Sequence, residues 1–353
     1  MKIGIVIPTY NSENTIKQTL NSVKNLKNKR FVDIYCVVID DKSKDKTNLI
    51  IQDYIDKEVV DIFIENKKNL GVSETRNIGI KECKNTDYIT FLDDDDEIID
   101  SAFNQLNNIV NSDLVFFNFF VNRGNNLQKI KPNVSYNKVD GSISDLEILE
   151  YLKKYLIQPN KESLLISSWG KLFRSSIIFD NKIFFNKKMR LFEDVEFNFK
   201  FMQHVNKLNY INKDLYIHNI PDGRKILDSA TMGKYGDIAD MFSYTNALHQ
   251  LNLFLKKKDS KNNYKHLINH CISVYTVISL IRASIRIRSM YSFIKVLKGI
   301  RIIFNKNHLV QPFNFYDQNK TNGNFLIPFF IRKKLFFLAL LFAVIEGRKR
   351  YFK

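Results

Sequence analysis

Short apolar runs alternate with stretches of helical periodicity along the first 120 residues. Polar or turn-forming residues end each run, and apolar residues at spacings of three and four follow it. This alternation predicts an α/β fold with a mostly parallel sheet and helices on both faces. The predicted strands are Lys2–Ile7, Ile34–Ile39, Ile62–Ile64, Tyr88–Leu92 and Asp113–Val121, and the predicted helices begin near Ile16, Leu49 and Ser73.

Polar clusters follow three of these strands directly. They are Pro8–Asn11, Asp40-Asp41 and Asp93–Asp96. Ligands of parallel sheets bind beyond the carboxyl ends of the strands. We therefore expect the three clusters to converge on one crevice.

The pattern is less regular further along the chain. The segment Asn122–Asp140 is polar and is interpreted as a surface insertion, and a second ordered block, Ser167–Ile220, contains a helical stretch at Glu193–His204. From Tyr235 to Phe304 the periodicity is helical. The predicted domains are a sheet-based domain over residues 1–225 and a basic, mainly helical C-terminal region over residues 226–353.

Charge is distributed unevenly between these two parts. The net charge is +17, and residues 226–353 hold 21 of the 54 Lys and Arg residues but only 6 of the 37 Asp and Glu residues. This asymmetry favours an anionic partner for the C-terminal region, either a membrane surface or a nucleic acid, with a solvated basic face as the alternative.

The last segment, Phe329–Lys353, has an apolar core between two basic clusters. The core, Leu335–Ile345, is shorter than the roughly 20 residues that a membrane-spanning helix requires. It fits a helix lying in the membrane interface or a buried core helix.

Composition indicates a globular protein with thiols in a reducing compartment. Hydrophobic residues make up 44% of the chain, and the three cysteines, Cys36, Cys83 and Cys271, are far apart among apolar residues. The apolar stretch after Met1 is too short for the core of a signal peptide. We expect a cytoplasmic location, and the basic C-terminal region could bring the protein to the inner face of the cell membrane.

The run Asp93-Asp94-Asp95-Asp96 is the strongest candidate for chemistry. Adjacent carboxylates raise one another's pKa and repel, so a neutralising partner is expected. Mg²⁺ or Mn²⁺ would suit this run, because hard cations are held by one or two carboxylates together with substrate phosphates. Asp93 and Asp95 have the spacing for metal ligands, and a solvated helix cap is the alternative.

Five segments follow one another in a characteristic order: Ile7–Asn11, Val38–Asp45, Asn69–Gly71 with Thr75–Gly79, Phe91–Asp96, and Glu193-Asp194. Together they resemble the signature blocks of glycosyltransferase family 2, as found in bacterial capsule, cell-wall and surface-polysaccharide glycosyltransferases. Lys42 departs from the family pattern, in which Gly or Asn is common at this position, and so does Asp94, where Ser or Ala is common. The resemblance covers roughly residues 1–225 and implies a GT-A nucleotide-sugar domain.

The resemblance also implies roles for residues on the donor side. Pro8, Tyr10 and Asp41 would frame the nucleobase, with Asp41 accepting from the imide of uracil if the donor is a UDP-sugar. Arg76, Asp93 and Asp94 would bind the nucleotide-sugar, and Arg76 would neutralise the diphosphate or pin the acidic run. A surface ion pair is the alternative for Arg76.

An acidic pair is expected on the acceptor side. Inverting transfer requires the acceptor hydroxyl to lose its proton as it attacks. The family assigns this step to the Glu-Asp pair, so Asp194 is the predicted base and Glu193 the orienting residue. Stabilisation of a helix N-terminus is the alternative.

Three further residues are candidates for the acceptor side. Trp169 and Lys171 lie in a block, Ser168–Arg174, that resembles the acceptor region of polysaccharide-forming members. Trp169 is either a platform for a sugar or part of the core. His218 is a candidate for contact with metal or diphosphate, and the alternative is that it has no role as a ligand.

The predicted function is inverting, metal-dependent transfer from a nucleotide-sugar to a glycan or lipid-linked acceptor. A non-catalytic, membrane-associated module that binds sugar or nucleotide is the alternative. Nucleic-acid binding is not predicted, because only the basic C-terminal region supports it. The sequence leaves open whether the protein forms an oligomer. No Gly-rich phosphate loop is present in the sequence, which argues against dehydrogenases and P-loop enzymes.

Overall fold

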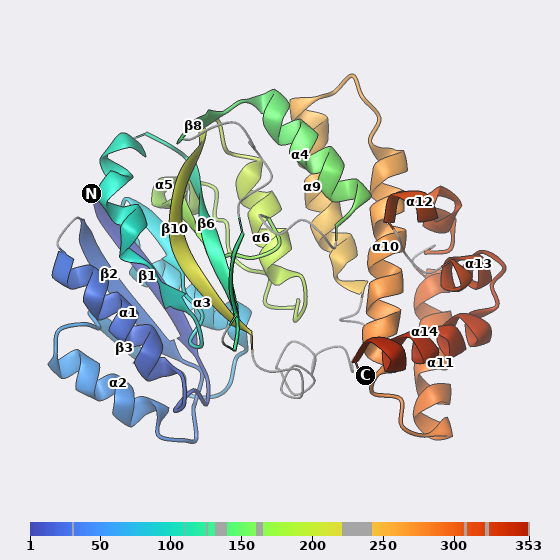
Figure 1. Ribbon diagram of the computed structural model, residues 1–353, viewed down its shortest axis with the longest axis horizontal. Coiled ribbons are helices and arrows are strands. Elements are labelled where there is room, and N and C mark those ends of the chain that lie inside the picture. The colour runs from blue at the N-terminus through green and yellow to red at the C-terminus, as the bar shows by residue number, and fades with distance from the viewer. Residues whose placement is uncertain are drawn as a thin grey trace. The chain divides into compact units, whose positions relative to one another are not determined.

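The chain forms two compact units. The computed structural model describes residues 1–29, 32–109, 111–124, 126–130, 140–159, 165–220, 242–306, 309–321 and 325–351. Unit 1 comprises Met1–Ile148 and Leu164–Asp222, and unit 2 comprises Leu149–Ser163 and Gly223–Lys353 (Figure 1). The predicted boundary between residues 225 and 226 lies outside the described residues.

A single sheet forms the centre of unit 1, with the order β3-β2-β1-β4-β9-β6-β10-β5. Strands β1 to β4 are parallel, β9 is antiparallel to both β4 and β6, and β10 is parallel to β6. The mostly parallel centre and the α/β class are as predicted. The strands are β1 (Lys2–Thr9), β2 (Asp33–Asp40), β3 (Ile62–Glu65), β4 (Tyr88–Phe91), β5 (Glu97–Ile98), β6 (Leu114–Arg123), β7 (Asn126–Ile130), β8 (Asp140–Ile143), β9 (Lys171–Arg174) and β10 (Leu208–Ile220).

Helices cover both faces of this sheet, which explains why its central strands are apolar on both sides. Ile5 packs into the core beneath α1 and α2, whereas Val6 faces α3. A Cβ at Gly79 of α3 would lie 2.4 Å from Val6 Cγ1, so the missing side chain lets α3 lie close against β1. The helices are α1 (Ile16–Lys29), α2 (Thr47–Asp56), α3 (Val72–Glu82), η1 (Asp100–Ile109), α4 (Asp145–Ile157), α5 (Ser175–Asp180) and α6 (Glu193–Met202).

The predicted surface insertion at Asn122–Asp140 is partly ordered structure. β6 continues to Arg123, and β7 turns back to pair with it, while β8 begins at Asp140 and pairs with β10. Residues 131–139 lie outside the described part of the chain. The polar composition misled the prediction because β7 is exposed along most of its length and needs no apolar alternation.

Unit 2 is helical in its described residues, as the periodicity predicted. Its helices are α9 (Tyr244–Lys258), α10 (Lys265–Ser284), α11 (Met290–Lys306), η3 (Gln311–Phe315), α12 (Gln318–Thr321), α13 (Leu326–Arg332) and α14 (Phe336–Tyr351), and most of α4 also belongs to this unit. Among the described helices, α10 alone has the length and apolar character to cross a membrane, and 72% of its apolar window is buried within the protein. That burial is typical of a core helix.

All three cysteines are buried thiols, as predicted. Cys36 and Cys83 lie in unit 1, and Cys271 lies in unit 2 on α10. Burial raises the pKa of the Cys36 thiol to about 12, and it also raises the pKa of the thiols of Cys83 and Cys271. None of the three is poised to react in the folded chain.

Candidate active site

The three polar clusters at the strand ends meet, as predicted. Asp94, after β4, accepts a hydrogen bond of 3.1 Å from the backbone N–H of Tyr10 and another from the hydroxyl of Ser12. The Asp41 N–H donates to the Thr9 carbonyl over 2.8 Å. The strands β2, β1 and β4 pair in parallel, so their carboxyl ends lie side by side at the same edge of the sheet.

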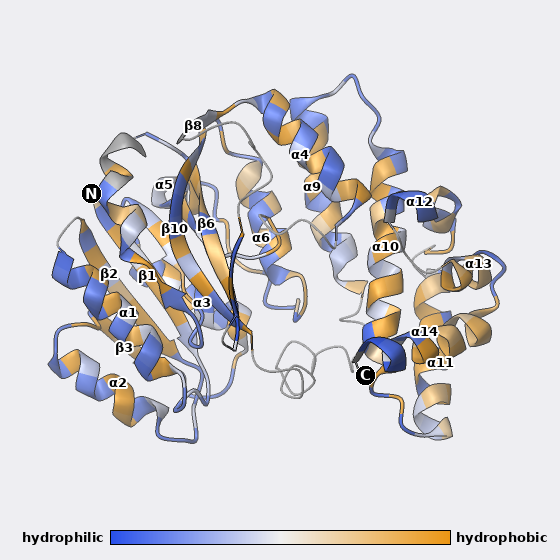
Figure 2. Cartoon of the chain, in the orientation of Figure 1, coloured by the Kyte–Doolittle hydropathy of each residue, from blue (hydrophilic) through white to orange (hydrophobic). Residues whose placement is uncertain are grey.

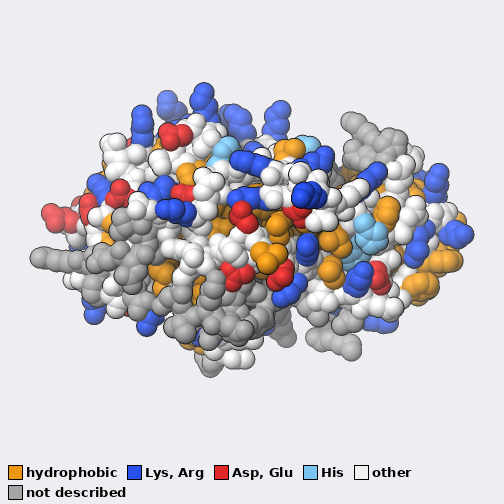
Figure 3. Space-filling model, turned by 90° about the horizontal axis from the view of Figure 1, so that it is seen from above, with side chains coloured by type: hydrophobic (Ala, Val, Ile, Leu, Met, Phe, Trp, Pro, Cys, Tyr) orange, Lys and Arg blue, Asp and Glu red, His pale blue; other side chains and the backbone are white. Residues whose placement is uncertain are grey.

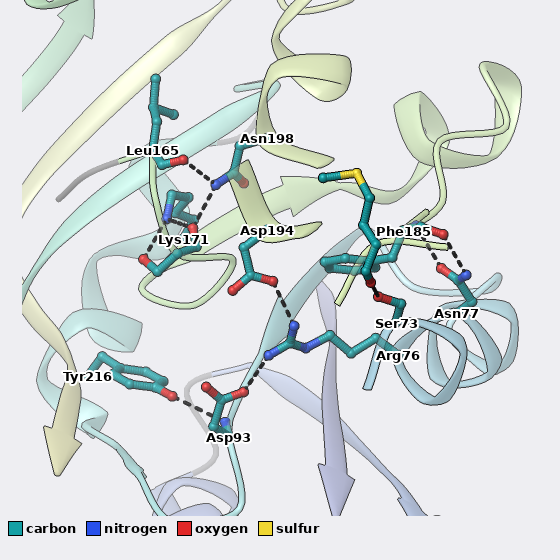
Figure 4. Close-up of polar contacts among 12 residues, drawn as sticks. Ser73, Arg76, Asn77, Asp93, Leu165, Lys171, Phe185, Asp194, Asn198 and Tyr216 are labelled. Atoms are coloured by element: carbon teal, nitrogen blue, oxygen red, sulfur yellow. Dashed lines mark hydrogen bonds and ion pairs between the residues drawn. The ribbon is translucent and has the colours of Figure 1, made fainter. Parts of the chain in front are cut away.

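Arg76 connects this edge of the sheet to α6. Its Nη2 donates to Asp93 Oδ1 over 2.7 Å, and its Nη1 donates to Asp194 Oδ1 over 2.6 Å (Figure 4). The Arg76 side chain is 4% exposed, and Asp194 and Asp93 raise its already high pKa although burial opposes the charge. A permanent cation therefore holds the acidic run and the acidic start of α6 opposite each other.

Helix α3 also fixes the segment that leads into α6. Asn77 Nδ2 donates to the Phe185 carbonyl over 2.9 Å, and the Phe185 N–H donates to Asn77 Oδ1 over 2.8 Å. Ser73 Oγ donates to the Met189 carbonyl (Figure 4). Asp194 is thus positioned by the same helix that carries Arg76, which is why a pair separated by 118 residues is held so closely.

The Asp41 carboxylate holds the loop before α3 through hydrogen bonds. Its Oδ1 accepts from the Leu70 N–H over 2.7 Å and from Asn66 Nδ2 over 2.9 Å, and its Oδ2 accepts from the Gly71 N–H over 2.8 Å. A carboxylate has about four acceptor positions, so one remains on Oδ2 for a ligand. The predicted contact with a nucleobase imide stays a prediction.

The four acidic residues have different surroundings. Asp96 is 1% exposed and accepts hydrogen bonds from Tyr216 Oη over 2.7 Å and from the Asn219 N–H over 2.7 Å. Burial raises the pKa of Asp94 to about 6, although the hydrogen bonds from Ser12 and Tyr10 oppose this change. Asp95 lies at the exposed rim, where partial desolvation followed by the charges of Asp96, Asp93 and Asp94 raises its pKa to about 8.

This donor set fits a divalent cation that is shared with a substrate. Asp93 and Asp95 would supply hard oxygen ligands, and a cation beside them would relieve the repulsion that helps to raise the pKa of Asp95. Among the described residues, no three His, Cys, Asp or Glu side chains converge into a ready-made metal cage. One or two carboxylates completed by phosphate oxygens and water are the arrangement that Mg²⁺ usually adopts.

A stack of three rings borders the acidic run. Trp169 lies 4.5 Å from Tyr216 at an angle of 5° and 5.1 Å from His218 at 26°, measured between ring centroids and planes. His218 Nδ1 lies 3.1 Å from Asp96 Oδ2, and Asp96 raises the His218 pKa against the effect of burial. Trp169 therefore packs against the core and also steadies the side chains that hold Asp96; its role as a sugar platform stays a prediction.

Lys171 is buried behind the Trp169 turn. Its Nζ donates to the Ser167 carbonyl over 2.5 Å, and Asn198 Nδ2 donates to the same carbonyl over 2.7 Å (Figure 4). The Lys171 Nζ also donates to the Trp169 carbonyl over 2.9 Å. The side chain thus binds the turn that presents Trp169. Burial lowers the pKa of Lys171 to about 7, although Asp194 opposes that change.

The remaining predicted residues lie around the same site. Pro8 is buried in β1, Tyr10 is 44% exposed just beyond it, and Glu193 is nearly buried at the start of α6. Tyr216 was not predicted as a site residue, although its Oη accepts from the Asp93 N–H and donates to Asp96. Its only signal was its place in the short apolar run Leu215–Ile217.

A mostly parallel sheet with acidic residues at a central strand end, faced by a second acidic pair, defines a glycosyltransferase of the GT-A type. Residues 4–177 of the chain belong to glycosyl transferase family 2, as a match to that family shows. The resemblance found in the signature blocks is thereby confirmed.

Curated relatives agree with this assignment. The glycosyltransferase GlyA of Streptococcus pneumoniae is 29% identical over 228 residues, which is 63% of this chain and 31% of that protein. The poly(ribitol-phosphate) β-N-acetylglucosaminyltransferase TarP of Staphylococcus aureus is 31% identical over 226 residues, or 62% of each chain. The matched part therefore spans less than two thirds of either relative.

A solved structure shares the fold over the whole chain. Residues 1–349 of Staphylococcus aureus TarS, in complex with UDP, superpose with a TM-score of 0.64 at 16% identity, covering 100% of this chain and 92% of that one. A complex of the same protein with UDP-GlcNAc superposes with a TM-score of 0.62. The helical C-terminal region is thus part of the shared architecture.

Replacing Lys171 with Met is expected to change how stability depends on pH. Because burial lowers the pKa of Lys171 to about 7 from 10.5, the unfolded chain holds a proton that the folded chain lacks between these values. Stability contributed by Lys171 therefore rises with pH in that window. From pH 7 to pH 9, urea unfolding should show the wild type gaining about 2 kcal/mol relative to Lys171→Met, since one pH unit corresponds to about 1.4 kcal/mol.

The matched control is Lys182→Met, at an exposed lysine. It should differ from the wild type by the same amount at both pH values. A constant difference for Lys171→Met as well would show that Lys171 keeps its ordinary pKa in the folded chain.

Proposed function

We propose that this protein is an inverting, metal-dependent glycosyltransferase that moves a sugar from a UDP-sugar to a hydroxyl of a surface glycan or a lipid-linked acceptor. One observation carries the proposal: Arg76 binds both the strand-end acid Asp93 and the helix-borne acid Asp194, which brings the two acids into one site. A single displacement needs a leaving-group side and a base side, and this arrangement supplies both.

Asp194 is the proposed base. It lies at the start of α6, and one of its oxygens is held by Arg76 while 20% of the side chain stays exposed. An acceptor hydroxyl at the second oxygen would give up its proton as it attacks the anomeric carbon. Glu193, the neighbouring residue, is proposed to orient the acceptor.

Asp93 and Asp95 are proposed to hold Mn²⁺ or Mg²⁺. When bound, the cation would stabilise the charge that develops on the leaving diphosphate. Arg76, already placed beside Asp93, would add a second positive charge on the leaving-group side. Asp94 and Asp96 would support this arrangement, because the first anchors Tyr10 and Ser12 and the second is held by Tyr216.

UDP-GlcNAc is the first donor to test. The TarP and TarS relatives are named N-acetylglucosaminyltransferases, and TarS was solved with UDP-GlcNAc. The purified chain would be assayed for UDP release and sugar transfer with a panel of UDP-, GDP- and dTDP-sugars, with and without Mn²⁺. Turnover of at least one donor that requires Mn²⁺ is expected, and no hydrolysis or transfer from any donor would contradict the proposal.

Asp95→Asn is expected to weaken the binding of the turned-over donor by about 100-fold, because even the residues that only support a metal ligand typically contribute about 10- to 100-fold to metal affinity. Calorimetric titration in Mn²⁺ measures the effect, and titration in EDTA is the reference. Asp87→Asn, at a site beyond the opposite end of β4, is the control and should bind as the wild type does. Equal affinity of Asp95→Asn and the wild type would remove Asp95 from the metal site.

A non-catalytic binding module is the second candidate, since family folds can persist without chemistry. Donor binding without turnover in any acceptor mixture would favour it. We also propose an anionic membrane surface as the partner of the C-terminal region, because residues 226–353 carry most of the net positive charge.

A further inference from the structure

Helix α14 is apolar on two opposite sides. The side chains of Ala339, Leu340 and Ala343 are buried within unit 2, whereas Phe337, Leu341 and Ile345 are exposed by 47%, 38% and 39%. The exposed three follow one another at spacings of four, which places them on one face of the helix. A helix with apolar residues all round is normally covered on every side.

Helix α13 extends this exposed face. Phe325, Leu326 and Phe329 are exposed by 47%, 38% and 37%. Aromatic contacts connect α13 to α14: the ring centroid of Phe329 lies 5.5 Å from that of Phe330, and the centroid of Phe330 lies 5.3 Å from that of Phe342. We call the six exposed residues Phe325, Leu326, Phe329, Phe337, Leu341 and Ile345 the outer face of the α13–α14 hairpin.

Basic residues border the outer face at both ends. Arg332 ends α13, Lys333 and Lys334 lie in the exposed turn that follows it, and Arg348, Lys349 and Arg350 lie exposed in the last turns of α14. Figure 2 shows α14 changing from hydrophobic to hydrophilic colour at its C-terminal end, and Figure 3 shows orange side chains among blue ones at the C-terminal helices. Glu346, the acidic residue nearby, is paired with Lys349 and Arg350.

We infer that the outer face of the α13–α14 hairpin docks on an anionic lipid surface, with its aromatic and aliphatic side chains in the interface and its basic flanks at the headgroups. This inference rests on the membrane partner proposed above but is independent of sugar transfer. The apolar face and the cationic flanks together match the two terms of interfacial binding, apolar burial and attraction to anionic lipid.

Charge favours lipid over a second copy of the chain. Symmetric pairing of two outer faces would bring each basic flank near another, because residues 226–353 hold 21 basic but only 6 acidic residues. Like charges at an interface are costly. An anionic bilayer instead neutralises both flanks at once.

The test is co-sedimentation of the full chain with vesicles at low salt. The wild type should bind vesicles of phosphatidylcholine with phosphatidylglycerol and should bind far less to phosphatidylcholine alone. Replacing Arg332, Lys333 and Lys334 with Gln should weaken binding by about 100-fold, since each basic residue near an anionic surface contributes about fivefold. Replacing Phe329, Phe337 and Leu341 with Ser should abolish binding.

Matched controls come from unit 1. Gln at the exposed residues Lys81, Lys84 and Lys182, and Ser at the exposed residues Leu49 and Leu127, should leave vesicle binding unchanged. Donor turnover without vesicles and circular dichroism establish that each variant is folded. A folded variant that keeps turnover but loses binding supports the docking face even if the natural acceptor is unknown.

Two results would overturn the inference. One is wild-type binding that does not depend on phosphatidylglycerol or that survives both triple substitutions. The other is a concentration-dependent dimer, detected by ultracentrifugation without lipid, that the Ser substitutions abolish, because a second copy would then cover the outer face.

Discussion

Asp194→Asn is expected to lower kcat for sugar transfer by about 10³-fold while the donor affinity changes by less than about threefold. A positioned general base typically contributes 10²–10⁴-fold, and Asn cannot accept the proton. The substitution preserves the side-chain shape, and its carbonyl oxygen can still accept from Arg76 Nη1. Steady-state UDP release and calorimetric donor binding measure the two quantities separately.

The control for this substitution is Asp180→Asn, at an exposed acid that ends α5 in the same unit. It should leave kcat unchanged. A wild-type kcat for Asp194→Asn would refute the assignment of the base. A fall in donor affinity that matched the fall in kcat would make Asp194 a binding residue instead.

Arg76→Met is expected to destabilise unit 1 by about 3 kcal/mol. Removing one partner of a buried ion pair leaves the remaining charge without compensation, and here two carboxylates, Asp93 and Asp194, lose the same partner. Urea unfolding followed by circular dichroism measures the loss. Arg76→Lys should lie between Met and the wild type, because one ammonium group cannot donate to both carboxylates with the geometry of a guanidinium.

An exposed arginine provides the comparison. Arg123→Met, at the end of β6, should change stability by less than about 0.5 kcal/mol. If Arg76→Met unfolded at the same urea concentration as the wild type, the ion pairs of Arg76 with Asp93 and Asp194 would contribute little to stability.

The parallel half of the sheet could be predicted because both of its signals are local. Each strand from β1 to β4 is an apolar run, and polar clusters directly follow β1, β2 and β4, so these strands and their ends are visible within a few residues. Asp93–Asp96 and Asp40-Asp41 could therefore be assigned to one edge. The helix start at Glu193 was also local, since three acidic residues precede an apolar pattern.

Interactions between distant segments could not be read in this way. The contacts of Arg76 with Asp194 and of Tyr216 with Asp96 span 118 and 120 residues, and no local pattern encodes such a distance. β9 was missed because its four residues stand outside the alternation of strands and helices, although they lie between β4 and β6 in the sheet. The two interpretations of Trp169 were left open because burial in a core and exposure to a sugar use the same residue type.

Lys42 shows how a departure from the family pattern acquires a structural meaning. Its φ of +70° lies in the left-handed region, where Gly and Asn are favoured, which accounts for their frequency at this position in the family. Lys42 keeps the conformation while its Nζ pairs with Glu65. The departure therefore changes the local backbone energy and leaves the carboxylates of the site unchanged.

The three buried thiols allow the local unfolding of each unit to be followed separately. An alkylating reagent needs an exposed thiolate, and burial both hides the sulfur atoms and raises their pKa, so labelling of the native chain requires a transient unfolding event. Modification of Cys36 and Cys83 would time the opening of unit 1, and modification of Cys271 that of unit 2. Mass spectrometry of the labelled peptides would thus reveal whether the two units unfold transiently together or independently.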